Sequence, residues 1–191
     1  MRHALSVFRG KRVLVTGDTG FKGSWLCLWL RELGAEVAGY ALAPERADDH
    51  FNLLRLDRLI RHTTADIRDY ARLTGVMRRF KPEFVFHLAA QSLVRISYAE
   101  PKPTFDTNVA GSVNLLEAVR NTPSVRALVY VTSDKCYVNR EWARGYREDD
   151  VLGGRDPYSA SKAAAEHAFE AYRRSFFAHR RDLGVGMVSS V

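Results

Sequence analysis

The sequence predicts an α/β fold, namely a Rossmann doubly wound parallel sheet with helices on both faces. Strand-like and helix-like segments alternate along the chain, and the first strand-like segment runs into a glycine-rich turn and an apolar helix. The 191 residues suffice for one domain with a real core. Strands that alternate with helices form parallel sheets, because each helix carries the chain back across one face. The expected strand order is 3-2-1-4-5-6, with ligands at the carboxyl ends of the strands.

Each element is predicted from its own pattern of apolar residues. The expected strands are Arg12–Thr16, Glu36–Leu42, Ile60–Ala65, Glu83–Leu88, Ala127–Thr132 and Gly184–Val191. The expected helices are Lys22–Leu33, Asp69–Phe80, Thr104–Asn121 and Pro157–Arg180, with a short helix around Phe51–Leu56. Two long loops, one marked by Pro101 and Pro103 and the other by Gly153 and Gly154, are where function is expected to lie.

The composition is that of a soluble globular protein with a basic balance. Apolar residues make up 46% and charged residues 27%, and the net charge is +7. This charge fits anionic ligands such as nucleotides, but the arginines are spread along the chain, so nucleic-acid binding is not expected. The two cysteines, Cys27 and Cys136, show no disulfide or metal spacing, so we expect no metal and, by default, a cytoplasmic location. No segment approaches the ~18 apolar residues of a membrane span.

The first predicted strand ends in the turn Gly17-Asp-Thr-Gly20-Phe21-Lys-Gly23. Its spacing is G-x-x-G-x-x-G rather than G-x-G-x-x-G, but strand, glycine-rich turn and helix are the context of a dinucleotide site. Glycines let the backbone approach a pyrophosphate, and the helix N-terminus offers unpaired N–H groups. We therefore expect a phosphate cradle, the alternative being a helix-starting turn without a ligand. Trp25 and Trp29 in the following helix are expected to pack in the core.

A second motif, Asp156-Pro-Tyr158-Ser-Ala-Ser-Lys162, places a tyrosine and a lysine four residues apart. On a helix these positions share a face, so the ammonium of Lys162 can lie near the phenol of Tyr158. A free tyrosine has a pKa near ~10, and a neighbouring positive charge favours the phenolate and lowers that pKa. The pair is a candidate device for removing a proton from an alcohol while a hydride leaves the same carbon. The alternative is two neighbours on a solvated helix face.

Together these two motifs resemble the extended short-chain dehydrogenase/reductase superfamily, which includes nucleotide-sugar epimerases and dehydratases. Four further stretches are similar to its CDP-glucose 4,6-dehydratase family: Gly17-Asp-Thr-Gly-Phe-Lys-Gly-Ser-Trp25, His87-Leu-Ala-Ala-Gln91, Thr132-Ser-Asp-Lys-Cys-Tyr137 and Asn139-Arg-Glu-Trp-Ala-Arg-Gly-Tyr-Arg-Glu148. The similarity runs from about Phe8 onward. The third stretch is the most specific, because related dehydratases usually have an acidic residue where Lys135 stands.

The resemblance implies a lyase that converts CDP-glucose to CDP-4-keto-6-deoxyglucose. Such enzymes oxidise the sugar at C4, remove water across C5–C6 and return the hydride to C6. Tyr158 would take the C4 hydroxyl proton, Lys162 would lower the pKa of Tyr158, and Ser133 would hold the C4 oxygen. Asp134 would protonate the leaving C6 hydroxyl, and Lys135 would remove the C5 proton. A basic Lys135 needs a pKa well below ~10.4, which burial or the charge of Lys162 could provide. The alternative for residues 133–135 is an ordinary strand-to-loop turn.

The resemblance also implies NAD as the cofactor. Its pyrophosphate, adenine, ribose and nicotinamide would contact Gly17, Gly20, Phe21, Gly23, Asp66, Ile67, Leu88, Ala89, Ala90, Tyr158 and Lys162. Asn108 would either contact the cofactor or steady the fourth and fifth strands. NAD recognition often uses an acidic residue at the end of the second strand, but Gly39-Tyr-Ala-Leu42 has none. Because Arg46 could favour a 2′-phosphate, NADP stays open.

Members of this family are about twice as long as this chain, and their C-terminal portion holds most of the nucleotide sugar. We expect residues 1–191 to be a truncated NAD(P)-binding Rossmann domain whose C-terminal substrate domain is absent. Such a chain would bind the cofactor with little turnover, because the substrate is poorly held. Its partner would be a nucleotide-sugar substrate, and helical faces allow a homodimer. The alternatives are another nucleotide-sugar epimerase or dehydratase and a catalytically silent dinucleotide-binding fragment.

Overall fold

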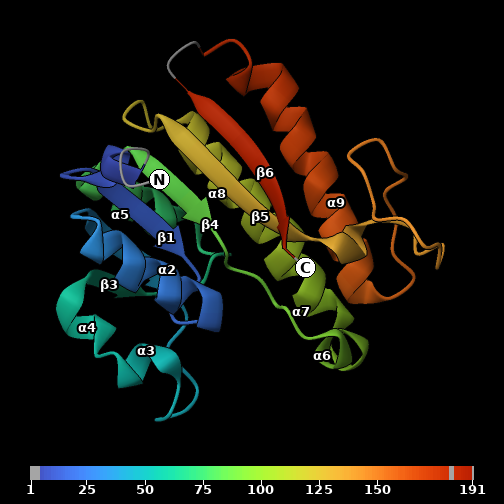
Figure 1. Cartoon of the computed structure of the whole chain (residues 1–191), viewed down its shortest axis with the longest axis horizontal. Helices are drawn as coiled ribbons and strands as arrows, with labels where there is room; N and C mark the ends of the chain where they lie inside the picture. Colours follow the sequence, from blue (N-terminus) through green and yellow to red (C-terminus); the bar gives the residue numbers. More distant parts are fainter. Residues whose placement is uncertain (1–4, 181–182, 191) are drawn as a thin grey trace.

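The computed structural model describes residues 5–180 and 183–190, which form one parallel sheet with the strand order β3-β2-β1-β4-β5-β6 (Figure 1). The predicted strand order is therefore confirmed. In the centre of the sheet, Thr16 pairs with Tyr40 on one side and with His87 on the other. The strands are β1 (Arg12–Thr16), β2 (Glu36–Ala41), β3 (Arg61–Thr64), β4 (Phe84–His87), β5 (Ala127–Ser133) and β6 (Gly184–Ser190). Val191, the predicted end of the last strand, lies outside the described residues.

The helices that connect the strands have the following bounds: α2 (Phe21–Glu32), α3 (His50–Leu53), α4 (Leu56–Leu59), α5 (Tyr70–Phe80), α6 (Val94–Ala99), α7 (Pro101–Phe105), α8 (Gly111–Arg120) and α9 (Pro157–Tyr172). Short 3₁₀ turns are η1 (Ser6–Phe8) and η3 (Asp134–Cys136), and π-helical turns are η2 (Asp106–Ala110) and η4 (Arg173–Phe177). The turns η2 and η4 join α7 to α8 and extend α9, so these helices run on without a break.

Two connections differ from the sequence prediction. The segment after β4 is not a loop, because α6 and α7 fill most of it, and Pro101 is at the start of α7. Proline is favoured in the first helical turn, where its missing N–H has no partner to lose. The short helix expected around Phe51–Leu56 is two helices, α3 and α4, separated by Arg55 in the left-handed conformation (φ +52°).

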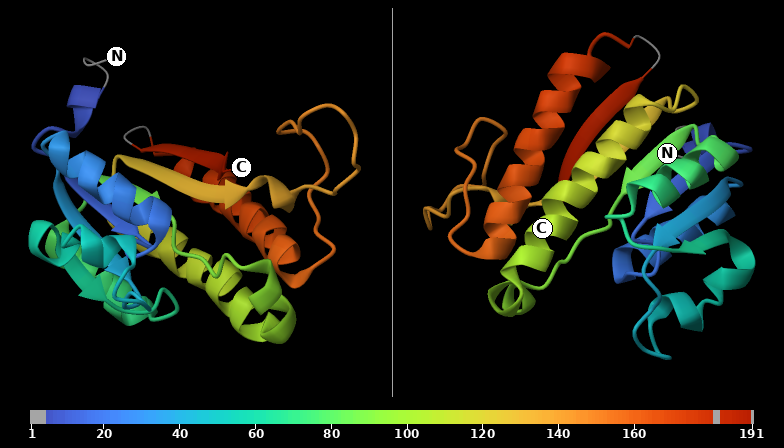
Figure 2. Two further views of the ribbon diagram at one scale, coloured as in Figure 1. Left: turned by 60° about the horizontal axis from the view of Figure 1, so that its bottom comes forward. Right: turned by 180° about the vertical axis from the view of Figure 1, so that it is seen from behind.

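The sheet has a hydrophobic core on each face, because successive side chains of a strand point to opposite sides. Leu14 of β1 lies in the core beneath α5, α8 and α9, whereas Val13 and Val15 lie in the core beneath α2, α3 and α4. Figures 1 and 2 show these two helical layers on opposite faces of the sheet. Helices on both faces of the sheet, as expected of this fold, are thus present over β1, β2 and β3.

The second face is less covered over the later strands. Phe8 of η1 packs against Phe84 and Phe86 of β4, with ring centroids 5.2 Å and 6.0 Å apart. Val129 and Val131 of β5 are only partly buried, and within residues 5–180 and 183–190 no helix covers them on this side. The reason is topological, since α2, α3 and α4 belong to the crossovers between β1, β2 and β3 and lie over those strands.

The prediction that Trp25 and Trp29 pack in the core is wrong. Their exposed fractions are 50% and 54%, so both lie on the outer face of α2. The buried residues of this helix are Gly23, Ser24, Cys27 and Leu30, which form the face that meets the sheet. Small residues at the helix start allow α2 to lie close to the turn after β1, and that contact fixes which face points inward.

Candidate active site

A cavity of about 930 Å³ opens at the carboxyl ends of the strands. It is bounded by the glycine-rich turn, by the ends of β2, β3, β4 and β5, and by the first turns of α9. Eleven of the residues predicted from the sequence line this one cavity, namely Gly17, Gly20, Phe21, Gly23, Asp66, Ile67, Leu88, Ala89, Ala90, Tyr158 and Lys162. Residues far apart in the sequence therefore face the same space.

The glycine-rich turn has the geometry of an anion cradle. Gly17 has φ +78°, a conformation that favours glycine. A Cβ at Gly23 would lie 2.0 Å from the carbonyl oxygen of Gly17, so the turn and α2 touch backbone to backbone. Gly20 is the N-cap of α2 and offers no side chain to cap the first amides of the helix. Uncapped amides at a helix N-terminus favour a negatively charged ligand, so these residues fit a pyrophosphate.

The helix α9 carries the predicted catalytic pair. Asp156 caps the helix, because its carboxylate accepts hydrogen bonds from the backbone N–H of Ser159 (3.0 Å) and from the Ser159 hydroxyl (2.6 Å). Tyr158 and Lys162 then follow on one face, are 7% and 8% exposed, and line the cavity. Burial lowers the pKa of Lys162 to about 8. The pKa of Lys162 is therefore close to neutral pH, so the amine can gain or lose its charge under ordinary conditions.

The segment Ser133-Asp134-Lys135 follows the end of β5. The Ser133 hydroxyl donates to Oδ1 of Asp134 (3.1 Å) and accepts from the backbone N–H of Lys135 (3.3 Å). Ser133 is buried, Asp134 is half-buried and Lys135 is exposed, and the cavity is lined by the preceding Thr132 rather than by these three residues. The burial that could make Lys135 a base is therefore not provided by the described residues, and the roles of the three side chains stay predictions.

Asn108 is 1% exposed and its side chain bonds to other parts of the protein. Oδ1 accepts from the backbone N–H of Gln91 (2.8 Å), and Nδ2 donates to the Gln91 carbonyl (3.0 Å) and to the Ser161 hydroxyl (2.9 Å). These contacts join η2 to the segment after β4 and to α9, and the role expected for Asn108 in steadying the fourth and fifth strands stays a prediction. A direct contact between Asn108 and a cofactor stays a prediction.

A buried hydrogen-bond chain behind the cavity was not anticipated from the sequence. Nδ1 of His87 lies 2.7 Å from the Thr16 hydroxyl, and Nε2 lies 3.2 Å from the Ser112 hydroxyl, which donates to the Asn108 carbonyl (2.7 Å). Because the Ser112 proton is already used, Nε2 donates to Ser112, and in a neutral ring Nδ1 then accepts from the Thr16 hydroxyl. Burial agrees with this, because it lowers the pKa of His87 to about 3. The Thr16 hydroxyl in turn accepts from the backbone N–H of Ala89 (3.3 Å), a cavity residue.

A second unanticipated feature lies beside the phosphate cradle. Asp18 is fully buried, and its Oδ2 lies 2.7 Å from Nδ1 of His62, which is 44 residues further along the chain. Nε2 of His62 lies 3.0 Å from the Thr64 hydroxyl. A Cβ at Gly39 would lie 2.0 Å from Oδ2 of Asp18, so the missing side chain makes room for this carboxylate. The sequence signal was present in Gly39, whose place in a strand suggests a close approach.

Two arginines beside the part of the cavity formed by the ends of β2 and β3 are already paired. Arg46 donates two hydrogen bonds to the carboxylate of Asp48, at 2.8 Å and 2.7 Å. Arg68 donates to both oxygens of Asp66, and this hydrogen bonding lowers the pKa of Asp66. Glu45, Asp48 and Asp49 line the cavity here, so carboxylates are the prevailing charge at this end.

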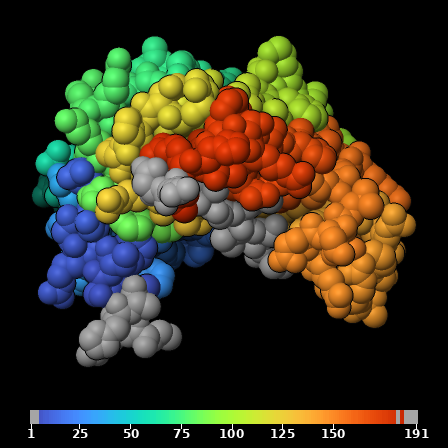
Figure 3. All heavy atoms as spheres, turned by 90° about the horizontal axis from the view of Figure 1, so that it is seen from above, coloured from blue at the N-terminus to red at the C-terminus, as the bar shows by residue number. Residues whose placement is uncertain are grey.

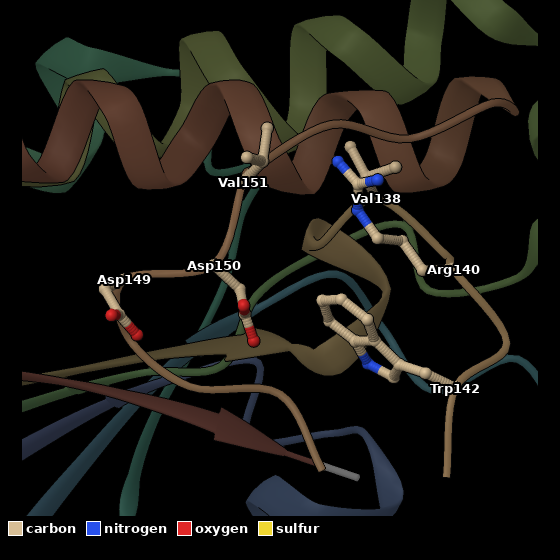
Figure 4. Close-up of a pocket in the computed structure, with 6 residues that line it drawn as sticks. All are labelled: Val138, Arg140, Trp142, Asp149, Asp150 and Val151. Atoms are coloured by element: carbon tan, nitrogen blue, oxygen red, sulfur yellow. The ribbon is translucent and has the colours of Figure 1, made fainter. Parts of the chain in front are cut away.

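The segment between η3 and α9 projects from the body as a lobe, coloured orange in Figure 3. It encloses a smaller cavity of about 210 Å³, whose lining side chains are drawn in Figure 4: Val138, Arg140, Trp142, Asp149, Asp150 and Val151. Arg144 holds the lobe together, because its guanidinium lies 3.8 Å from the Trp142 ring centroid and pairs with Asp150 at 2.5 Å. The residues predicted to be catalytic do not line this cavity.

Comparison with known proteins places these features in a family context. A sequence model of the family described as GDP-mannose 4,6 dehydratase matches residues 14–181. The chain is 53% identical over 184 residues to a CDP-glucose 4,6-dehydratase of Salmonella typhimurium, covering 95% of this chain and 51% of that protein. It is 37% identical to a UDP-glucose 4-epimerase of Mycolicibacterium smegmatis, covering 86% of this chain and 52% of that protein. The chain thus spans about half the length of the curated relatives it matches.

Solved structures show the same fold. A Thermus thermophilus UDP-glucose 4-epimerase in complex with NAD superimposes with a TM-score of 0.76 at 31% identity, covering 93% of this chain and 54% of that chain. A Thermotoga maritima UDP-glucose 4-epimerase with UDP-glucose gives a TM-score of 0.80 at 26% identity, covering 93% and 54%. Among the described residues, no helix has both the length and the apolar character needed to cross a bilayer.

Proposed function

This chain belongs to the GDP-mannose 4,6-dehydratase family, and on that basis we propose that it is the cofactor-binding half of an NAD-dependent CDP-glucose 4,6-dehydratase. The observation that carries the proposal is the single cavity that Gly17, Gly23, Tyr158 and Lys162 line together. A phosphate cradle and a tyrosine–lysine pair in one space are what alcohol oxidation by a nicotinamide cofactor requires. The identity to the Salmonella typhimurium dehydratase favours CDP-glucose as substrate.

The cofactor would lie along the cavity from the acidic adenosine end to α9. The pyrophosphate would be held by the turn at Gly17 and Gly20 and by the first amides of α2. When bound, the cofactor supplies a reversible hydride acceptor. The paired Arg46 and the neighbouring carboxylates support NAD over NADP, because a 2′-phosphate would meet negative charge where it needs a free cation.

Proton transfers would be made by the protein's own side chains. Tyr158 would take the C4 hydroxyl proton, and the charge of Lys162 would favour the phenolate form. Ser133 would hold the C4 oxygen. Asp134 would protonate the departing C6 hydroxyl, since hydroxide is a poor leaving group without an acid. Lys135 would remove the C5 proton, which the neighbouring C4 ketone makes acidic.

Two measurements test this proposal. Calorimetric titration of this chain with NAD should give binding, and Tyr158→Phe should leave that binding largely unchanged because it keeps the ring.

In a version extended to the length of the relatives, CDP-glucose should yield a 4-keto product, and Tyr158→Phe should lower the rate by about 10²–10⁴-fold. NAD binding without any 4-keto product from the extended protein would contradict the dehydratase and leave a silent dinucleotide-binding module. Clear turnover by these 191 residues alone would contradict the proposal that they are half of the active enzyme.

A 4-epimerase is the competing activity, and the exposed position of Lys135 is the observation that favours it. An epimerase would share Ser133, Tyr158 and Lys162 but would not need an acid and a base at Asp134 and Lys135. Lys135→Met should therefore abolish product formation by a dehydratase and leave an epimerase active.

A homodimer also stays a prediction, and light scattering of the purified chain measures it directly.

A further inference from the structure

The helix α9 buries one carboxylate that the proposed mechanism does not use. Glu166 is 3% exposed and lies four residues after Lys162, so the two side chains occupy the same helix face. The Thr132 hydroxyl donates a hydrogen bond of 2.6 Å to Oε1 of Glu166, and Thr132 itself lines the cavity. A carboxylate is costly to bury unless it is hydrogen-bonded or faces a positive charge, so its position calls for an explanation.

We propose that Glu166 is a positioning residue whose buried negative charge keeps the amine of Lys162 in its charged form beside the Tyr158 hydroxyl. The proposal rests on the proposed function, because it assigns a means of activating the same tyrosine. The hydrogen bond from Thr132 fixes the carboxylate against the end of β5, so that its charge stays beneath the cavity instead of turning toward solvent.

The surroundings of Lys162 explain why a counter-charge is needed. Burial lowers the pKa of Lys162 to about 8, and the effects that oppose burial come from Cys136 first and then from Glu166. A free thiol has a pKa near ~8.5 and a free glutamate one near ~4.3, so at neutral pH a carboxylate is the more completely charged of the two. The other titratable groups that face Lys162 or Glu166 are uncharged near neutrality or belong to the catalytic pair: His87 of β4, Tyr130 of β5, Tyr137 after η3 and Tyr158 of α9.

The consequence concerns how Tyr158 works. A neutral amine at Lys162 exerts little pull on the phenol proton, whereas an ammonium favours the phenolate. Without the charge of Glu166, only the effect of Cys136 would oppose burial among these two groups, and the ammonium of Lys162 would be lost at a lower pH. Glu166 would thus raise the upper limit of the pH range in which Tyr158 is assisted, because the ammonium of Lys162 is lost as the pH rises through its pKa.

The test measures the charge state of Lys162 directly by NMR titration of its side chain in this chain, with the resonance assigned by its loss in Lys162→Arg. Glu166→Gln keeps the oxygen that accepts from Thr132 and removes only the charge, so the pKa of Lys162 should fall by about one pH unit or more. Glu166→Asp retains the charge and should restore most of that loss.

Two matched controls separate charge from structure. Glu170 lies one turn further along α9, and its carboxylate already pairs with Arg173 and Arg174, so Glu170→Gln should leave the pKa of Lys162 unchanged. Cys136→Ser removes the thiol and should change this pKa less than Glu166→Gln does. A larger effect of Cys136→Ser would assign the role to the thiol and overturn the proposal.

The proposal is also overturned if Glu166→Gln leaves the pKa of Lys162 where it is in the unaltered chain. If Glu166→Gln does not fold, as judged by circular dichroism, the unaltered chain still decides, because a Lys162 pKa well below 7 would show that Glu166 does not keep the amine charged. The titration needs neither cofactor nor substrate, so a failure of NAD binding would contradict the proposed function without affecting this result.

Discussion

The contact between α2 and the glycine-rich turn can be tested with a single methyl group, in the substitution Gly23→Ala. The added Cβ would lie 2.0 Å from the carbonyl oxygen of Gly17, 2.8 Å from its carbonyl carbon and 2.9 Å from the Cα of Asp18. All three are backbone atoms, so no side chain can rotate away. Because non-bonded carbons rest about 3.5–4.0 Å apart, the turn and the helix must separate by about 1 Å or more.

This displacement predicts how much stability and NAD affinity the substitution removes. Overpacking in a close-packed interior destabilises proteins by about 1–3 kcal/mol. For a chain of this size, 1 kcal/mol corresponds to about 2–4 °C in Tm, so Gly23→Ala should lower Tm by roughly 2–12 °C. The same movement carries the uncapped amides of α2 away from the proposed pyrophosphate site, and we expect the affinity for NAD to fall at least about tenfold, or ~1.4 kcal/mol.

The assay is thermal unfolding followed by calorimetric titration with NAD, with Gly75→Ala as the matched control. Gly75 lies inside α5, where the nearest atom to an added Cβ is the flexible Nη1 of Arg79 at 3.5 Å. This control should raise stability by about 0.5–1 kcal/mol, because glycine is unfavourable in a helix, and should leave NAD affinity unchanged. A Gly23→Ala variant with the Tm and NAD affinity of the unaltered chain would refute the reasoning.

Two further predictions concern charge. The folded pKa of His87, about 3, lies below the ordinary value of 6.5, so its contribution to stability is complete above pH 6.5 and is lost as the pH falls from 6.5 toward 3. In this range, denaturant unfolding of the unaltered chain should show the free energy of unfolding falling by up to ~1.4 kcal/mol per pH unit, and the His87→Gln variant should lack this fall. If the free energy of unfolding has the same slope against pH in both proteins, His87 is not a neutral buried ring. Asp48→Ala frees Arg46 and removes a carboxylate from the cavity, so titration should show the affinity for NADP rising about tenfold relative to NAD. An unchanged NADP-to-NAD ratio would mean that Arg46 lies out of reach of the 2′-phosphate.

The strands were predictable from the sequence to within a residue or so at each end. β1 has the predicted bounds, and β2 ends one residue early, at Ala41. Buried parallel strands leave a strong local signal, because runs of β-branched residues are bounded by polar turns. The helices after β4 were harder to predict, since Pro101 and Pro103 usually mark loops, whereas here Pro101 begins α7.

Some residues of the candidate site were predictable from the sequence and others were not. Gly17, Gly23, Tyr158 and Lys162 were found from local spacing, because a helix or a turn fixes the relation between residues a few positions apart. Glu166 was missed although it stands four residues after Lys162, because a glutamate on a helix is ordinarily solvent-exposed. Only its burial against Thr132 distinguishes it.

The sequence by itself determined the parallel sheet, its strand order, the turn that fits a pyrophosphate and the helix that presents Tyr158 and Lys162. Each of these follows from periodicity and spacing within one element or between consecutive elements. Tertiary structure alone decided which face of α2 is buried, that Lys135 is exposed, and that Asp18 meets His62 across the sheet. Such contacts depend on how closely segments that are distant in the sequence approach one another. This distance is set by packing in three dimensions, and packing produces no periodic pattern of residues that could be recognised in the sequence.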